Sequence, residues 1–430
     1  MQRRPLARTE GRIALILVFL LASIAFPPGA LLALTPDEAV EMAQRSLPTY
    51  AASRSSMRSF EELHKSTLSA YLPRVDATAS GTHINGRSTV QDIGTLDVTA
   101  SYTIYDGGLR RANRDISKSN LDISREEVSK RFLDLVFNVK SAFYTTIARK
   151  DILEQRRIQL NDAQKDYEVA SGRNELGAAK LSDKLQASVR LEQARFNLVQ
   201  AEGDLANSLT QLNSLVGRPL TSGYDLMGSI ETEPVIPDRE KLTTAALERP
   251  EIRQLRSNVE ISKSNKAVEK SAFYPTLSAH ATYSRADTTL SGVSTGEDKS
   301  VGLTLTWNIF QLQTFYRTRA AEFAIDESKE NLKETERTVL LALHQDYQDY
   351  VTAIRNISTA KEQLASAEQN YAQAFGEYKL GRSDILGLVQ AESSLSTARE
   401  QLTTSMLSVV LARLLLERDS GGERLEAMRP

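Results

Sequence analysis

Few residues of this sequence are of a type and spacing that could carry out chemistry. The chain has no cysteine, and no two of its histidines share helical spacing; the four are His64, His83, His280 and His344. A thiol nucleophile and a thiolate metal site are therefore excluded, and no metal site is expected. No phosphate-binding glycine loop and no convincing nucleophile and base pair is found, since Gly107-Gly108 is interpreted as a turn. We expect neither catalysis nor a cofactor.

Composition narrows the class of protein further. Of 430 residues, 41% are hydrophobic and 25% are charged, with a formal net charge of −2. This balance favours neither a basic nucleic-acid-binding surface nor a disordered acidic tail. Because domains usually have about 100–200 residues, the chain could hold two or three of them. Partners must therefore be predicted from residue patterns, and nucleic acid is not expected to be one.

The N-terminal segment, 1–33, is interpreted as a secretory signal peptide. Four arginines precede an apolar run from Ile13 to Phe26, and small residues and prolines follow it. The arginines are Arg3, Arg4, Arg8 and Arg12. Cleavage near Ala33 would expose Leu34, and Ser23 to Ala25 offers an earlier site. A single membrane anchor is the alternative, but the run is shorter than the roughly 20 apolar residues that a spanning helix needs. An exported chain without cysteine must be stabilised by packing and cannot be lipid-anchored through cysteine.

The rest of the sequence contains an internal repeat. Residues 69–73 (Ser-Ala-Tyr-Leu-Pro) match residues 271–275 (Ser-Ala-Phe-Tyr-Pro) at an offset of 202, and Gly177 matches Gly381 at an offset of 204. Chance does not keep such a register over some 170 residues, so we infer a duplication. The predicted units are a first repeat over 34–216, a connector over 217–250, a second repeat over 251–418 and a tail over 419–430.

Each repeat is predicted to contain two long helices. These segments lack proline and have apolar residues spaced three to five apart; they cover about 107–171 and 180–215, then about 313–380 and 384–418. A helix of about 65 residues is about 100 Å long, far more than a compact domain allows. Such lengths favour coiled-coil-like packing. A soluble coiled-coil rod would explain the helices equally well.

Each repeat is also predicted to contain one β-hairpin, at about 74–106 and about 276–310. Here the apolar period changes to two, as where Leu96, Val98 and Ala100 alternate with polar residues. Each strand of about 10–11 residues has the length and the two unlike faces of a membrane-spanning strand. Aromatic residues gather at the helix-proximal ends, where a membrane barrel has its aromatic girdle: Tyr102, Tyr105, Trp307 and Phe310. A half-buried sheet in a soluble α+β protein is the alternative.

Four strands cannot close a barrel in lipid, because an open edge leaves backbone groups unpaired. Other copies of the chain must supply the remaining strands. Three copies would give twelve strands and a water-filled lumen, although symmetry alone also allows two or four copies. The predicted fold class is α+β and mainly α: internally duplicated long coiled-coil-like helices with two β-hairpins.

Taken together, these features resemble the TolC family of outer-membrane efflux and secretion channels over essentially the whole mature chain. The resemblance rests on the duplicated halves and on three short sequences: Tyr105-Asp106-Gly107-Gly108, its counterpart Ile309-Phe310-Gln311, and Tyr378-Lys379-Leu380-Gly381. It implies a homotrimer with a 12-stranded barrel in outer-membrane lipid and a 12-helix periplasmic tunnel. The connector and the C-terminal segment would form a belt around that tunnel.

The resemblance also implies a contact with a periplasmic adaptor (membrane fusion) protein at the two helical breaks. The matching residues are Leu176, Gly177, Ala178, Leu380, Gly381 and Arg382. The glycines would allow close backbone approach and tight turning. Two glycines that simply join helices are the alternative.

Family channels are narrowed at this end by side chains of the inner helices. The matching positions are Asp183, Tyr378, Arg382, Ser383, Asp384, Gly387 and Gln390. Gly387 and Gln390 replace acidic residues of the best-known pattern, and Ser383 stands where arginine is expected, which argues against a strong cation-binding gate. Asp183 and Asp384 would still form carboxylate rings, with Arg382 placed to pair with one of them. Solvated surface charge is the alternative for Arg382 and Asp384.

The implied function is passive conduction from a tripartite efflux or type I secretion complex to the exterior. An inner-membrane pump of the RND, ABC or MFS type would supply the energy, and small helix rotations would open the periplasmic end. Two other classes remain open: a periplasmic coiled-coil adaptor or scaffold without a pore, and an exported enzyme. The cargo also remains open among toxic small molecules, metal ions and polypeptides, with small-molecule efflux the most frequent in the family.

Overall fold

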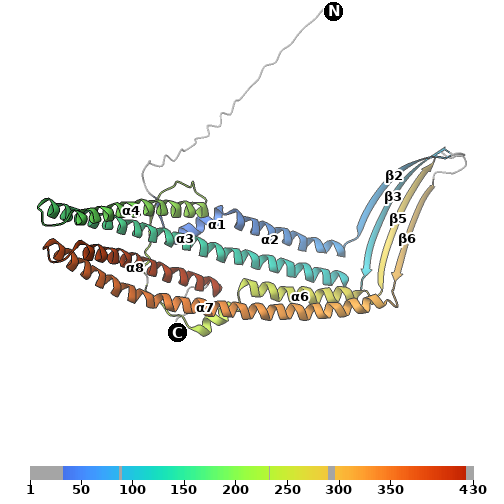
Figure 1. Cartoon of the computed structure of the whole chain (residues 1–430). Helices are drawn as coiled ribbons and strands as arrows, with labels where there is room; N and C mark the ends of the chain where they lie inside the picture. Colours follow the sequence, from blue (N-terminus) through green and yellow to red (C-terminus); the bar gives the residue numbers. More distant parts are fainter. Residues whose placement is uncertain (1–31, 87–89, 232, 289–295, 423–430) are drawn as a thin grey trace, which may run out of the picture.

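The computed structural model describes residues 32–86, 90–231, 233–288 and 296–422 (Figure 1). The predicted signal peptide lies outside these residues except for Leu32 and Ala33, and so does the tail after residue 422. The chain is mainly helical with two β-hairpins at one end, as predicted. No helix in the described part of the chain is both long and apolar enough to cross a membrane.

Two very long helices run the full length of the helical body. They are α3 (Leu109–Glu175) and α7 (Leu312–Lys379), of 67 and 68 residues, so each is about 100 Å long. Two shorter helices lie end to end along each of them: α2 (Pro48–Ser66) and α4 (Leu181–Val216) along α3, and α6 (Pro250–Ser271) and α8 (Ile385–Asp419) along α7 (Figure 1). The 3-10 turn η1 (Thr67–Tyr71) leads from α2 into the sheet.

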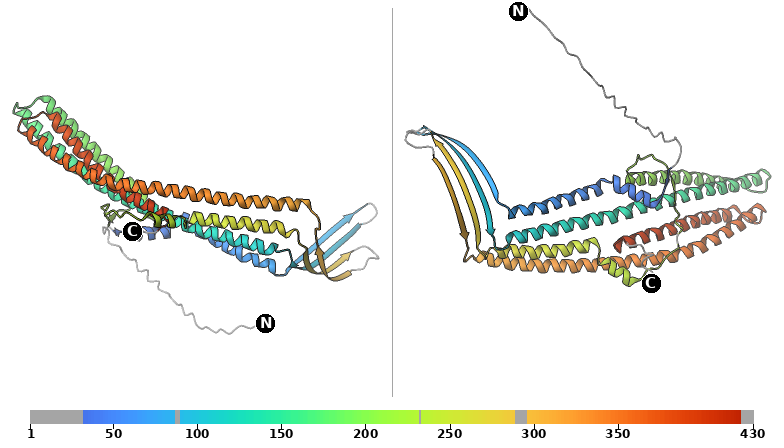
Figure 2. Two further views of the ribbon diagram at one scale, coloured as in Figure 1. Left: turned by 90° about the horizontal axis from the view of Figure 1, so that it is seen from below. Right: turned by 180° about the vertical axis from the view of Figure 1, so that it is seen from behind.

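The four long strands form one antiparallel sheet in the order β2-β3-β5-β6. The strands are β2 (Arg74–Asn85), β3 (Val90–Tyr105), β5 (Thr276–Thr288) and β6 (Gly296–Thr306). The register runs from Arg74 opposite Ser101 in the first pair to Thr276 opposite Thr306 in the last. In the described residues β2 and β6 each pair on one side only, so the sheet is open at both edges (Figure 2).

The helices next to the sheet follow the same lateral order as the strands. Helix α2 packs on α3, α3 on α6, and α6 on α7, so α2 and β2 form one lateral edge and α7 and β6 the other (Figure 1). At the far end of the body, α3 pairs with α4 and α7 with α8, and α8 also contacts α3.

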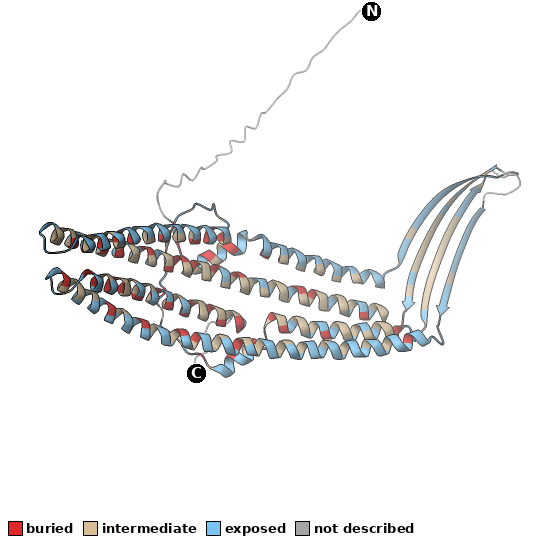
Figure 3. Cartoon of the chain, in the orientation of Figure 1, coloured by how far each residue is buried: buried red, intermediate tan, exposed pale blue. Residues whose placement is uncertain are grey.

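Burial is concentrated at mid-body and along the far helix pairs (Figure 3). At mid-body α1 (Pro36–Ser46) packs on α3 and α4 around Val139, Phe143 and Leu212, all fully buried. The short parallel strands β1 (Leu32–Leu34) and β4 (Tyr224–Leu226) lie against this core, and α5 (Arg239–Ala246) packs on α7. In the far pairs, buried alanines alternate with larger apolar residues, and the alanines let the helices approach closely. The buried alanines include Ala170, Ala187, Ala194, Ala391 and Ala398.

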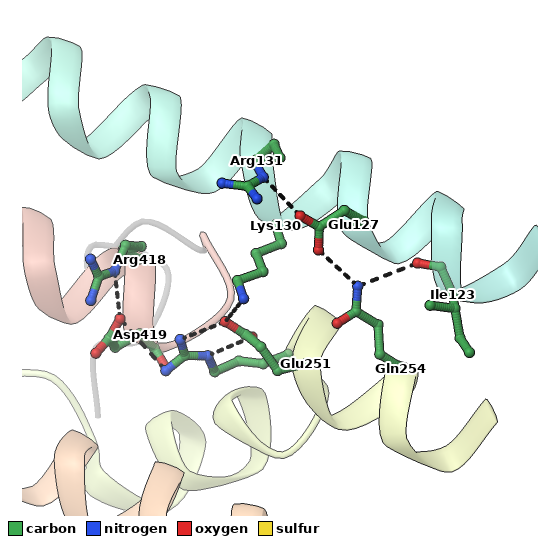
Figure 4. A network of polar contacts seen from close by, with 9 residues as sticks. Ile123, Glu127, Lys130, Arg131, Glu251, Gln254, Arg418 and Asp419 are labelled. Atoms are coloured by element: carbon green, nitrogen blue, oxygen red, sulfur yellow. Dashed lines mark hydrogen bonds and ion pairs between the residues drawn. The ribbon is translucent and has the colours of Figure 1, made fainter. Parts of the chain in front are cut away.

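Polar side chains join α3, α6 and the end of α8 (Figure 4). The guanidinium of Arg249, only 12% exposed, lies between the carboxylates of Glu251 and Asp419 at 3.3 and 3.5 Å. Gln254 of α6 donates to the Ile123 carbonyl and to Glu127 of α3. These contacts fix how α3 and α6 lie against each other.

The junction between strand β3 and helix α3 is a glycine turn. Gly107 and Gly108 have φ of 65° and 91°, the left-handed region that glycine adopts without penalty. The Asp106 carboxylate accepts hydrogen bonds from the backbone N–H groups of Gly108 and Arg110, and Arg110 in turn donates to the Thr103 carbonyl at 2.7 Å. The turn therefore joins sheet and helix rigidly.

Candidate functional site

The two helical breaks have the same backbone geometry. Gly177 and Gly381 have φ of 72° and 76°. In each break the residue after the glycine donates from its N–H to the carbonyl five residues earlier, Ala178 to Arg173 at 2.8 Å and Arg382 to Glu377 at 2.9 Å. This is the Schellman arrangement, which requires a left-handed residue at the glycine position. Both helix pairs thus turn through the same motif.

The reason for glycine differs in part from our expectation. A side chain on Gly177 would meet nothing within 4 Å, and one on Gly381 would meet only the flexible end of Arg173. Tight turning therefore accounts for the glycines, whereas close backbone approach within the chain does not. Next to them Leu176 and Leu380 are 85% and 68% exposed, and Ala178 and Arg382 are exposed as well.

Arg173, at the end of α3, connects the two breaks. Its guanidinium donates to the carbonyl of Tyr378 in the other helix pair and to the Ala178 carbonyl at 3.2 Å. It also lies 4.6 Å from the centre of the Tyr378 ring, which adds a cation–π attraction. The second repeat has Glu377 at the position that matches Arg173. The contact is therefore not duplicated, and the repeat pattern could not predict it.

Tyr378, a predicted constriction residue, lies in the core of the single chain. It is 1% exposed, packed with Ala170, Ala187, Ile385 and Leu388, and its hydroxyl has no hydrogen-bond partner among the described residues. Burial, followed by the negative charge of Asp183, raises the pKa of Tyr378. The phenol therefore remains a neutral, unused hydrogen-bond donor.

The other predicted constriction residues lie around the first turns of α4 and α8. Asp384 caps α8 by accepting the N–H of Gly387 at 3.1 Å, and Asp183 accepts from Ser182 at 3.2 Å. In the single chain Asp384 turns back to its own helix, and no ion pair of Arg382 occurs among the described residues. The pairing of Arg382 with one of these carboxylates in the assembly stays a prediction. The Ser383 hydroxyl is buried without a partner, and Gln390 is exposed.

An apolar groove of about 530 Å³ lies beside these turns, between α4 and α8. Leu185 and Val189 line it from α4, and Leu386 and Val389 from α8. Three of the four are more than half exposed: Leu185, Val189 and Leu386. The helical end therefore presents an apolar surface around two exposed turns.

Buried polar contacts join the two helix pairs further along the body. Glu392 of α8, 2% exposed, pairs with Arg190 of α4 and accepts from Gln159 of α3 at 3.2 Å. Tyr371 of α7 donates its hydroxyl to Asp166 of α3 at 3.2 Å. Neither contact could be predicted from the sequence, since the residues lie more than 200 positions apart and the two repeats do not share them.

Burial raises the pKa of Asp166 to about 7. The folded chain then binds a proton that the unfolded chain releases near pH 4, so this carboxyl lowers stability as pH rises from about 4 to about 7. We expect Asp166→Asn, which keeps the acceptor for Tyr371, to stabilise the protein at pH 8 by about 1–4 kcal/mol and hardly at pH 4. Thermal unfolding at both pH values measures this difference. A variant with the same or lower melting temperature at pH 8 would refute the effect.

The predicted aromatic girdle residues lie at the helix-proximal side of the sheet. Tyr102 and Tyr105 are 37% and 46% exposed, and Trp307 and Phe310 are 55% and 86% exposed. The Trp307 indole N–H donates to the Phe273 carbonyl at 3.1 Å, which fixes the ring at the start of the helical body. The described part of the chain therefore leaves all four rings at least partly exposed.

Comparison with known proteins then decides the family. A model of the outer membrane efflux protein family matches residues 39–218 and 242–422, once in each repeat. The chain belongs to the outer membrane efflux protein family. This confirms the family predicted from the sequence, whose members are channels of the outer membrane.

Relatives of this outer membrane efflux protein are distant in sequence and similar in fold. Escherichia coli outer membrane protein TolC is 21% identical over 378 residues, which cover 83% of this chain and 75% of TolC. The probable efflux pump outer membrane protein TtgC of Pseudomonas putida is 23% identical over 371 residues, covering 81% and 75%. The outer membrane channel CmeC of Campylobacter jejuni has 18% identity and a TM-score of 0.78 over 91% of this chain and 88% of CmeC.

Proposed function

We propose that three copies of this chain form a passive conduit from the periplasm through the outer membrane. The observation that carries the proposal is the open four-stranded sheet continued by helices about 100 Å long. Because neighbouring strands alternate in direction, the free edges of β2 and β6 are antiparallel, so copies side by side continue the same ladder. Three copies supply twelve strands, enough for a water-filled lumen.

The outward strand faces support a lipid environment for this barrel. On β6, Val301, Leu303 and Leu305 are 88%, 70% and 64% exposed in the single chain, a continuous apolar row that water would disfavour. The exposed rings of Trp307 and Phe310 follow at the helix-proximal end, where an aromatic girdle contacts the membrane interface.

At the other end, the exposed turns support contact with a periplasmic adaptor and, through it, an inner-membrane pump. Leu176 and Leu380 protrude at the two breaks beside the apolar groove. In the resting state the contacts of Arg173 with the carbonyl and the ring of Tyr378 hold the two helix pairs together. Separation of the helix pairs would widen the tunnel, with Asp183 and Asp384 on its rim. The names of two relatives describe an efflux pump and pyoverdine export, which supports small molecules as the cargo.

Conductance in planar lipid bilayers tests the gated conduit. We expect small pores from the unmodified protein and several-fold larger conductance from Arg173→Ala, because the variant loses the contacts between the two helix pairs. Arg195→Ala is the matched control, since Arg195 is exposed and, among the described residues, pairs only with Glu192 one turn earlier. If no variant forms a pore, the conduit is refuted.

A periplasmic scaffold without a pore is the rival function. A scaffold would retain the helices, but in water the exposed apolar strand residues would be unfavourable. Fractionation of cells discriminates between them: the conduit sediments with outer membranes, whereas a scaffold stays in the soluble periplasmic fraction.

A further inference from the structure

The two lateral edges of the helical body next to the sheet present faces that none of the described residues covers. Helix α2 forms one edge and α7 the other, and they run in opposite directions relative to the sheet (Figure 1). In the proposed trimer, α7 of one copy lies beside α2 of the next. The duplication supplies a template for this contact, because α7 corresponds to α3 and α2 to α6, and α3 packs on α6 inside the chain.

The template contact has a measurable register (Figure 4). Arg253 of α6 lies 3.7 Å from Glu126 of α3, and Gln254 donates to Glu127 at 3.1 Å. Residues of α3 match residues of α7 at an offset of 204, the offset between Gly177 and Gly381. Residues of α2 match residues of α6 at an offset of 202, the offset between Pro48 and Pro250. Glu126 therefore corresponds to Glu330, and Arg253 to Ala51.

Equivalent positions differ sharply in burial. On α3 the residues facing α6 are half-buried, whereas their counterparts on α7, Phe323, Glu327 and Glu330, are exposed. On α6 the half-buried residues include Ser257, Ile261 and Ser264, whereas their counterparts on α2, Ser55, Ser59 and Glu62, are exposed. The outer faces of α7 and α2 thus correspond to the faces of α3 and α6 that pack on each other inside the chain, but no described helix of the same chain packs on them.

The α7 face combines large apolar and charged side chains. Leu312, Tyr316 and Phe323 are 56%, 60% and 64% exposed and are spaced four and seven apart, on one side of the helix. Arg319 lies between them and Glu327 follows; neither has an ion pair among the described residues.

The α2 face is its complement. Ser55 and Ser59 are small and exposed, and Glu62 follows on the same side one turn nearer the sheet. Arg54 is exposed at the margin of this face and has no ion pair in the part of the chain that the structure describes. Large residues of α7 therefore oppose small residues of α2, and charges of opposite sign occur at corresponding levels.

We infer that α7 of one copy packs antiparallel on α2 of the next with Phe323 over Ser59, Arg319 opposite Glu62, and Glu327 opposite Arg54. The inference rests on the trimer proposed above and adds its register. The template places Glu330 of one copy beside Ala51 of the next. Both helices rise about 1.5 Å per residue. A step of three or four residues toward the sheet along α7 is therefore matched by a step of three or four residues toward the sheet along α2. The partner that this surface fits is a second copy of this chain.

Disulfide cross-linking tests the register, because the natural chain has no cysteine. We expect Ser59→Cys with Phe323→Cys to give, on mild oxidation, covalent species of two and three chains. The matched control is Ser59→Cys with Thr318→Cys, since Thr318 lies on the half-buried side of α7 toward α6; it should remain a single chain in denaturing gels. Native mass spectrometry of the same samples reports the number of copies independently.

The outcomes separate the two claims. Trimers by native mass that cross-link in the Phe323 pair support the register; trimers that do not cross-link with cysteine at 319, 323 or 327 overturn it and leave the trimer. The absence of any oligomer overturns both. Arg54→Glu should lower the temperature at which trimers dissociate, and the added Glu327→Arg should restore it; a double variant no better than the single one contradicts the ion pair.

Discussion

Gly107→Ala is expected to destabilise this outer membrane efflux protein more than any other single glycine substitution in the strand-to-helix turn. A Cβ at this position would lie 2.6 Å from the Ser271 carbonyl oxygen and 2.9 Å from the Tyr274 Cβ. Neither atom can move without shifting the junction between α6 and β5. The residue also has φ of 65°, which costs an alanine about 1–2 kcal/mol. With the overlap added, the loss is about 2–5 kcal/mol.

Gly108→Ala provides the matched control for this prediction. Its φ of 91° imposes the same kind of backbone cost, but a Cβ there meets nothing within 4 Å. The melting temperature from circular dichroism in detergent should therefore fall slightly for Gly108→Ala and much further for Gly107→Ala. Equal losses would mean that backbone conformation, and not contact with α6 and β5, determines the role of Gly107.

Arg190→Met should produce the second large effect, because it leaves the carboxylate of Glu392 buried without its cation. Glu392 is 2% exposed and its remaining partner is Gln159 at 3.2 Å. Removal of one partner of a buried ion pair typically costs about 3–5 kcal/mol. We expect this loss in thermal or denaturant unfolding, together with an easier separation of the two helix pairs.

The double variant Arg190→Met with Glu392→Leu separates the unpaired charge from the loss of a contact. Apolar replacement of a whole buried pair is often neutral or stabilising, so the double variant should recover most of the stability. Arg195→Met, on the exposed part of the same helix, should leave stability unchanged. A double variant as unstable as the single one would show that packing around Arg190 matters more than its charge.

Much of the fold was predictable because it depends on local patterns. The change of apolar period from three or four to two separates helices from strands, and Gly177 and Gly381 end helices because the Schellman turn needs a left-handed residue. The short strands β1 and β4 were not predicted, since three residues are too few to show a period.

The site was less predictable, because its contacts join residues that only folding brings together. Arg173 reaches Tyr378, and Arg190 reaches Glu392, across the two repeats. No spacing in the sequence indicates such a pair. Asp384, which we predict to lie in a carboxylate ring, caps its own helix in the single chain, a role that is common for an aspartate directly before the first helical residue.

The continuous helices α3 and α7 have a mechanical consequence. Each is an unbroken rod, whereas the helices beside it are two pieces joined at mid-body, where α2 gives way to α4 and α6 gives way to α8. Each joint is crossed by one continuous helix and supported by one short helix, α1 beside α3 and α5 beside α7, so we expect the helical wall to bend there before it bends elsewhere. A force applied at the exposed turns would bend the helical wall at mid-body. The ends of the two helix pairs can then move apart while the end of the body beside the sheet keeps its shape.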